Sequence, residues 1–219
     1  MRMRTKKWAK KELAESGFYI NNPTDYIGKW RSLFKNDFPL HLELGCGKGI
    51  FTSKIAKANP QINYIGVDLS TDVLGVCSRN IKSTFDSDPI DNILITNFNI
   101  EKIESVFNDL DIINRIYINF CNPWPKAKHN KRRLTHPTKL SKYKTFLQKG
   151  QSIYFKTDDD ELFESSIDYF NQSSFKITRL SYDLRNENYS DPEPNITTEH
   201  EEMFVSKGIK IKFLEAQLL

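Results

Sequence analysis

The stretch that decides the fold is residues 39–49, which read PLHLELGCGKG. Its first half has the apolar content of a short buried strand, and its second half is a glycine loop with the spacing Gly45-x-Gly47-x-Gly49. Apolar residues then recur at helical spacing until Asn59-Pro60, where a helix has to stop. A strand, a glycine loop and a helix in this order are typical of the first part of a doubly wound α/β domain.

The same alternation continues along the chain. Further strands are expected over residues 62–67, 92–98, 113–118 and 151–156, and amphipathic helices over parts of 70–81, 103–110, 140–147 and 163–170. Five alternations favour an α/β, Rossmann-like domain whose mostly parallel sheet carries helices on both faces. Residues 175–181 and 208–214 form a last pair of strands, with no helix predicted between them, which indicates an antiparallel edge strand.

Length and composition limit the class of protein. With 219 residues, 38% of them hydrophobic, the chain can build one sizeable core. Residues 1–38 are basic and aromatic and are expected to form an N-terminal arm and a lead-in helix over 23–34, ahead of the main domain at 39–219. The three cysteines, Cys46, Cys77 and Cys121, fit neither a disulfide framework nor a zinc site, so no metal is expected. Neither a signal peptide nor a membrane span is evident, so we expect a cytoplasmic protein, monomeric or homodimeric.

A second informative stretch is residues 119–133, NFCNPWPKAKHNKRR, which follows the strand expected at 113–118. Two prolines flanking a tryptophan end the strand, because proline fixes φ and removes a hydrogen-bond donor. A cationic run follows, with His129 among its members Lys126, Lys128, Lys131, Arg132 and Arg133. Such a segment at the carboxyl end of a strand is suited to binding a phosphate backbone, and the alternative is a solvated basic loop.

Acidic residues accompany the glycine loop. Glu43 directly before it would repel a pyrophosphate, but it suits the sulfonium and ammonium of S-adenosylmethionine. Asp68 ends the next strand 19 residues after Gly49, a spacing at which a carboxylate can meet ribose hydroxyls. Asn99 follows the third strand and is either an adenine contact or an ordinary turn residue. The loop is therefore expected to bind S-adenosylmethionine through Glu43, Gly45, Gly47, Gly49 and Asp68.

Three segments together carry a family resemblance. Residues 42–49, the run from 119 to 136, and TEHE at 198–201 resemble the bacterial tRNA (guanine-N7)-methyltransferases, and the similarity extends over about residues 38–215. The resemblance implies a class I methyltransferase fold, S-adenosylmethionine as methyl donor, and a guanine in the variable loop of tRNA as substrate.

Individual positions carry over from the family. The implied cofactor contacts are Glu43, Asp68, Asn99 and Asn122, and Asn122 also stands at the active-site position. The implied substrate contacts are Lys126, Asp158, Thr198, Glu199, His200 and Glu201, with an RNA-contacting segment at Lys128, His129, Lys131, Arg132 and Arg133. The chain departs from the family in having Asn99 and Asn122 where aspartate is usual, and His200 where tyrosine is usual.

The chemistry expected of such a site is simple. Guanine N7 keeps its lone pair at neutral pH, so no base is needed, and the protein contributes positioning and electrostatics. Asn122 is expected to offer its amide oxygen to a guanine N–H, with Asp158 or Glu201 accepting the other. Either acid also has a structural alternative, Asp158 in a helix cap and Glu201 in an exposed turn. Trp124 is either a base-stacking ring or a buried wedge.

Two other functions fit parts of the sequence. Asn122-Pro123-Trp124 is similar to the Asn-Pro-Pro-aromatic motif of exocyclic-amine methyltransferases, although Pro125 and the cationic run fit that motif less well. An RNA-binding module of the same fold with weakened catalysis is the other alternative, because two expected carboxylates are amides here.

Overall fold

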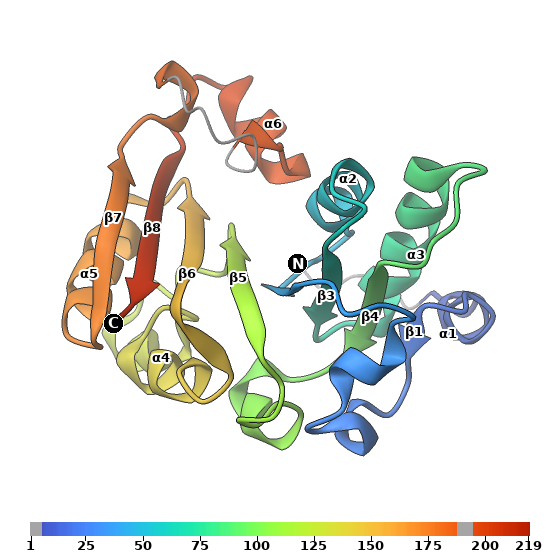
Figure 1. The fold of residues 1–219 in the computed structure, drawn as a ribbon. Coiled ribbons are helices and arrows are strands. Elements are labelled where there is room, and N and C mark those ends of the chain that lie inside the picture. Colours follow the sequence, from blue (N-terminus) through green and yellow to red (C-terminus); the bar gives the residue numbers. More distant parts are fainter. Residues whose placement is uncertain (1–5, 188–194) are drawn as a thin grey trace. The chain divides into compact units, whose positions relative to one another are not determined.

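A computed structural model describes residues 6–187 and 195–219, and the chain divides into two compact units, Met1–Asp111 and Ile112–Leu219 (Figure 1). Arg2 and Arg4 of the basic arm lie outside the described residues, as do Pro192 and Pro194 of the acidic segment, residues 181–202. No helix of the described residues is long and apolar enough to cross a membrane.

The first unit is built on parallel strands in the order β1-β4-β3-β2. Their bounds are β1 Tyr19–Ile20, β2 Leu40–Leu44, β3 Asn63–Asp68 and β4 Ile93–Asn97. Helices α2 (Ile50–Ala58) and α3 (Thr71–Phe85) make the connections and pack against each other. Every residue of β2 is buried, as expected for a parallel strand covered on both faces. The expected strand–loop–helix at 39–58 is therefore confirmed, and the Ser70 side chain caps α3.

The N-terminal residues of this unit contain more structure than the sequence indicated. Helix α1 (Ala9–Ala14) packs on α3, and β1 pairs with β4 in parallel. The lead-in helix expected over 23–34 is instead two 3₁₀ helices, η1 (Pro23–Tyr26) and η2 (Trp30–Leu33). Gly28, at φ 73°, separates them, and its N–H donates to the Asp111 carboxylate. Trp30 is fully buried and stacks on Phe107 with ring centroids 5.2 Å apart.

The third helix expected in this unit is also shorter. Residues 103–110 contribute only to the 3₁₀ helix η3 (Ile100–Ser105), and Leu110, expected on an apolar face, is 72% exposed. The Asp111 carboxylate accepts the backbone N–H of Asn108, so this segment turns rather than continuing as a helix.

The second unit has the strand order β5-β6-β8-β7. Its strands are β5 Ile113–Asn119, β6 Leu147–Thr157, β7 Phe175–Ser181 and β8 Lys212–Leu218. β5 and β6 are parallel, whereas β8 is antiparallel to both β6 and β7, so the predicted antiparallel edge is confirmed. The helices are η4 Ala127–Arg132, α4 Pro137–Tyr143, α5 Asp160–Asn171, η5 Leu184–Asn186 and α6 Glu199–Val205.

Three expectations about this unit were wrong. Helix α4 ends at Tyr143, and Leu147, the last residue of the helix expected over 140–147, begins β6. The last strand begins at Lys212 rather than at residue 208. The acidic segment before it contains α6, which starts with a capping box between Thr198 and Glu201.

Candidate active site

The glycine loop of the first unit joins β2 to α2 through three left-handed residues, Gly45, Gly47 and Gly49, at φ 84°, 55° and 71°. Gly49 is also required by close packing, because a Cβ there would lie 2.2 Å from the Cys77 sulfur. At Gly45 and Gly47 the same atom would meet nothing within 4 Å. The loop therefore leaves open space beside its first two glycines, where backbone can approach a ligand.

Two carboxylates border this loop. Glu43 lies in β2, is 4% exposed, and accepts a hydrogen bond from the Thr52 hydroxyl. Asp68 ends β3, and its two oxygens accept the backbone N–H of Gly47 at 3.0 Å and of Ser70 at 2.9 Å. Burial raises the pKa of Asp68, although its backbone hydrogen bonds act in the opposite direction. The structure thus brings together Gly47 and Asp68, two predicted cofactor residues.

The predicted adenine contact, Asn99, lies two residues after the end of β4, the strand that pairs with β3. Asn99 is exposed and caps η3, and its Oδ1 accepts the Glu101 N–H at 3.0 Å. Asn97, which the sequence analysis did not single out, pairs with Asp68 in the sheet and donates from its amide to the Asp68 carbonyl at 3.2 Å. Asn99 therefore has the expected structural role of a turn asparagine, and its contact with adenine stays a prediction.

In the second unit, the turn after β5 has a strained backbone. Phe120 and Trp124 adopt φ 50° and 46°, values that residues other than glycine seldom take. The Oδ1 of Asn122 accepts the Trp124 N–H at 3.1 Å, and the side chain of Asn122 is otherwise exposed. Because a backbone N–H can only donate, this bond identifies the oxygen and leaves the Asn122 NH₂ group on the outer side.

The cationic run separates into two groups. Lys126, Lys128, Lys131 and Arg132 are exposed, and the Arg132 guanidinium lies 5.0 Å from the centre of the Trp124 ring. His129 meets the same ring edge-on at 5.6 Å. Arg133, by contrast, is 1% exposed, so its side chain does not lie on the surface of the unit with its neighbours.

Asp158 lies at the same sheet edge, because β6 runs parallel to β5 and ends one residue before it. The cap of α5 is formed by Asp159, whose Oδ1 accepts the Leu162 N–H at 2.7 Å. The capping alternative therefore applies to Asp159, while Asp158 is half-buried and accepts Lys212 Nζ on its backbone carbonyl at 2.8 Å.

Residues 198–201 also approach the turn after β5. The His200 ring stacks on Phe120, with ring centroids 6.2 Å apart, and on Phe204 at 6.3 Å. The sequence analysis singled out neither Phe120 nor Phe204. Phe204 could have been found, because a residue four positions after His200 on a helix lies on the same face. Two stretches that lie about 80 residues apart in the sequence, the turn after β5 and α6, therefore come together within the second unit.

The two ends of this TEHE segment have structural partners. Thr198 is buried and caps α6, and Glu201 is fully buried. The Glu201 carboxylate accepts the Thr198 N–H, lies 3.3 Å from Lys156 Nζ, and forms an ion pair with Arg185. Glu199 and His200 are the exposed members of the segment.

The cysteines take no part in this chemistry. Cys46 and Cys77 are buried, as expected for small core residues, whereas Cys121 is half-buried. A hydrogen bond with Cys77, together with burial, raises the pKa of Cys46, and burial raises the pKa of Cys121 to about 12. Both thiols are therefore protonated at neutral pH and are poor nucleophiles.

Comparison with known proteins identifies the family. A family described as "Putative methyltransferase" matches residues 37–214. A tRNA (guanine-N(7)-)-methyltransferase of Clostridium beijerinckii is 52% identical over 218 residues, covering 99% of this chain and 98% of the relative. A protein of the same name from Clostridium perfringens is 49% identical and covers 100% of both chains.

The chain belongs to the tRNA (guanine-N7)-methyltransferase family.

Solved structures agree on the fold of this family member. The 16S rRNA methyltransferase KamB matches with a TM-score of 0.63 at 13% identity, over 87% of this chain and 92% of that one. An antibiotic-related methyltransferase matches with a TM-score of 0.58 at 17% identity, over 97% of this chain and 95% of that one. The predicted class I methyltransferase fold is thereby confirmed, and this class implies S-adenosylmethionine as methyl donor.

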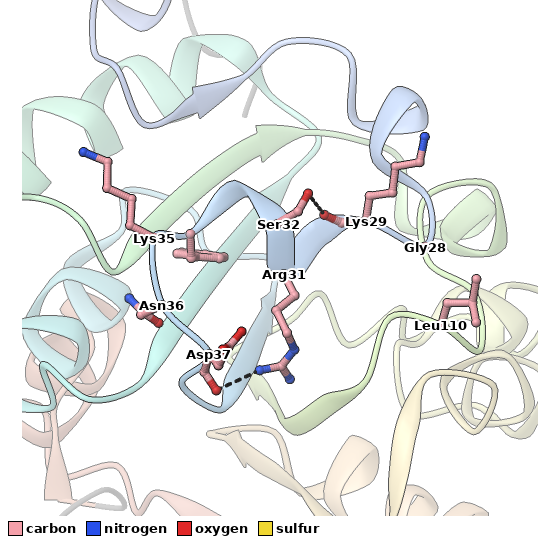
Figure 2. A pocket seen from close by; sticks show the side chains of 9 residues that line it. Gly28, Lys29, Arg31, Ser32, Lys35, Asn36, Asp37 and Leu110 are labelled. Atoms are coloured by element: carbon pink, nitrogen blue, oxygen red, sulfur yellow. Dashed lines mark hydrogen bonds between the residues drawn. The ribbon is translucent and has the colours of Figure 1, made fainter.

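A separate pocket of about 550 Å³ lies at the opposite end of β2 from the glycine loop, beside η2 (Figure 2). Its lining includes Lys29, Arg31 and Lys35, but the two lysine side chains point apart from each other. Arg31 donates to the carbonyls of Asp37 and Phe38 at 3.2 and 2.8 Å. None of the residues predicted for the active site lines this pocket.

Proposed function

We propose that this protein transfers a methyl group from S-adenosylmethionine to N7 of a guanine in the variable loop of tRNA. The observation that carries the proposal is the identity of about 50%, over essentially the whole chain, to proteins named tRNA (guanine-N(7)-)-methyltransferase. The arrangement of the predicted site residues within each unit supports it.

The residues of the first unit fit the donor chemically. Glu43 and Asp68 supply negative charge suited to a sulfonium and an ammonium, and Asp68 can also accept hydrogen bonds from ribose hydroxyls. The space beside Gly45 and Gly47, where a Cβ would meet nothing within 4 Å, admits a ligand close to the backbone. When bound there, S-adenosylmethionine supplies an electrophilic methyl carbon attached to a positively charged sulfur.

The residues of the second unit orient the guanine. Methyl transfer moves positive charge onto the guanine ring, which a nearby carboxylate such as Asp158 stabilises. The Asn122 amide oxygen has two lone pairs, so besides the Trp124 N–H it can accept a guanine N–H. Asp158 accepts the other of the N1–H and N2–H groups, a combination that distinguishes guanine from adenine.

The nucleic-acid contact is assigned to exposed cations of the same unit. Lys126, Lys128, Lys131 and Arg132 all follow the Asn122 turn and lie on the surface. Lysine and arginine side chains of this kind hold phosphates and position the substrate without reading its sequence. The Trp124 ring, half-exposed beside Arg132, is available to stack on an unpaired base.

The test is incubation of unmodified tRNA with labelled S-adenosylmethionine, followed by digestion and nucleoside analysis. We expect label in 7-methylguanosine. Label in an N2- or N6-methylated base would support the exocyclic-amine alternative. Binding of tRNA without any labelled nucleoside would support the RNA-binding module with lost catalysis.

A second measurement tests the basic surface. Replacing Lys128 and Lys131 with alanine should reduce the slope of log affinity for tRNA against log salt by about 0.7–0.9 for each phosphate that the variant no longer binds. The matched control replaces Lys149 and Lys176, two exposed lysines at the opposite end of β6 and β7, and should leave the slope unchanged. Equal slopes for the two variants would show that residues 126–132 form only a solvated loop.

A further inference from the structure

Arg133 is among the largest fully buried side chains of the protein. Its Nε donates to the Pro123 carbonyl at 2.8 Å and its Nη2 to the Trp124 carbonyl at 3.4 Å. On the other side, Nη1 donates to the Ser165 hydroxyl at 3.0 Å and Nη2 to the Glu161 carboxylate at 2.7 Å. The guanidinium therefore joins the turn after β5 to the first half of α5.

From this geometry we propose that Arg133 is a positioning residue for the methyl-transfer reaction and does not contact RNA. The proposal rests on the proposed function, because it assigns Arg133 the task of holding the turn that presents Asn122. It separates the last arginine of the cationic run from the exposed cations beside it in the sequence.

The turn needs such support because of its own sequence. Pro123 and Pro125 have no N–H to donate, so hydrogen bonds to this turn must come largely from groups that donate to its carbonyls. Trp124 is held at φ 46°, a conformation that persists only where the surroundings determine it. By binding the carbonyls of the two peptides that flank the Trp124 Cα, Arg133 fixes the Pro123–Trp124 peptide, whose N–H is bonded to Asn122.

The other two contacts of Arg133 connect the turn to α5. Ser165 and Glu161 lie on α5, the helix that follows Asp158 directly. Arg133 thus sets the distance between the Asn122 turn and the Asp158 end of β6, the two groups proposed to hold the guanine. A lysine cannot replace it, because only the planar guanidinium fork offers donors in two directions at once.

The kinetic experiment compares two arginines changed in the same way, Arg133→Lys and Arg179→Lys, the second on β7 and paired with Glu215 outside the proposed site. We expect Arg133→Lys to lower kcat about tenfold to a hundredfold, since a displacement near 1 Å at a reacting group has an effect of this size. Its KM for S-adenosylmethionine should stay unchanged. Arg179→Lys should leave kcat near that of the wild type, and equal kcat values for the two variants would overturn the proposal.

The salt dependence of tRNA binding distinguishes positioning from phosphate contact. Arg132→Gln should lower the slope by about 0.7–0.9, whereas Arg133→Gln should leave it unchanged because its guanidinium is buried. A decrease of the slope in Arg133→Gln as large as that in Arg132→Gln would show that Arg133 binds phosphate after all.

A spectroscopic measurement separates this proposal from the proposed function and from unfolding. The chain has three tryptophans, so protein labelled with 5-fluorotryptophan should give three ¹⁹F signals, with Trp124 assigned by Trp124→Phe. Arg133→Lys should shift the Trp124 signal and leave that of the buried Trp30 in place. An unchanged Trp124 signal would overturn the positioning role of Arg133 even in an active enzyme. A wild type without methyltransferase activity would overturn only the proposed function.

A second variant covers the case in which Arg133→Lys also moves the Trp30 signal. Ser165→Ala removes one hydrogen-bond partner of Arg133 and should shift the Trp124 signal alone. No shift of Trp124 in that variant would overturn the proposal.

Discussion

Changing Asn122 to aspartate should increase the activity of this enzyme. In the structure, Asn122 Oδ1 accepts the Trp124 N–H at 3.1 Å, and an aspartate oxygen can accept the same bond, so the turn is kept. The outward NH₂ group is replaced by a carboxylate oxygen that can accept a guanine N–H and stabilise the positive charge that develops on the ring. A hydrogen bond to a charged group contributes ~1.5–3 kcal/mol and a neutral one ~0.5–1.5 kcal/mol, so the gain is about 1 kcal/mol. In kcat/KM that is about fivefold.

A matched series separates the substrate bond from the turn bond. Asn122→Ser keeps a side-chain oxygen for the Trp124 N–H but does not reach the guanine, so it should lose about twofold to twelvefold in kcat/KM. Asn122→Ala loses both bonds and should be slower still. The assay is initial-rate methylation of unmodified tRNA, with donor affinity measured separately by calorimetry and expected to stay constant.

Two results would refute this reasoning. If Asn122→Ser equals the wild type while Asn122→Ala falls, the side chain only shapes the turn. If the wild type is inactive until Asn122→Asp is made, the natural chain is a weakened RNA-binding member of the family, and the amide is the cause.

The remaining predictions concern the support of each part of the site. Burial raises the pKa of Asp68, so this carboxylate protonates at a higher pH than an ordinary aspartate. The affinity for S-adenosylmethionine should be full above that pKa and fall as the pH is lowered through it. Calorimetry over about pH 4–7 should show this dependence in the wild type, and Asp68→Asn should flatten it. Gly49→Ala should destabilise the fold by more than about 1 kcal/mol, because it combines a left-handed φ with a Cβ 2.2 Å from the Cys77 sulfur. In urea denaturation, Cys77→Ala in the same chain should recover part of this stability. If the double variant loses the sum of the two single losses, the steric overlap with Cys77 is contradicted. Glu201→Gln removes the carboxylate that pairs with the buried Lys156. The amides of α6 should then exchange with deuterium faster, while those of β5 do not change. Equal protection of α6 in both proteins would show that this ion pair does not hold the helix.

The elements that sequence patterns predicted well are those with strong local signals. β2, α2 and β3 have dense apolar runs bounded by glycine or proline, and their observed limits lie close to the predicted ones. β1 is only two residues long and is held by pairing with β4, a contact that no local pattern reveals. α6 is a different case, because the capping box from Thr198 to Glu201 is visible in the sequence and marks a helix start. Its acidic composition led to the expectation of an exposed turn instead.

The sequence predicts site residues by type and position, but it does not predict their burial. The sequence brings Lys131, Arg132 and Arg133 together as one basic group, and only tertiary structure shows that the last of them points inward. Glu201 likewise reads as a surface acid until Lys156 and Arg185, from distant parts of the chain, are seen to surround it. Arg133 follows the short 3₁₀ helix η4 and Glu201 lies in the first turn of α6, and neither element is long enough for an apolar repeat to predict which side chains point inward.

The placement of these side chains explains how a strained, proline-rich turn can serve as a site for positioning a base. Within the turn, Asn122 Oδ1 accepts the Trp124 N–H. Arg133 donates to carbonyls of the turn, and the ring of Phe120 at its start stacks on His200 of α6. The Phe120 N–H also donates to the Lys156 carbonyl of β6 at 2.9 Å, so the turn is fixed at several points by different parts of the second unit. Residues that hold the turn and residues proposed to meet RNA are therefore neighbours in the sequence, and the distinction between Arg132 and Arg133 lies in burial rather than in residue type. A substitution in this segment has to be interpreted from the contacts of the individual side chain, because its neighbours in the sequence have a different role.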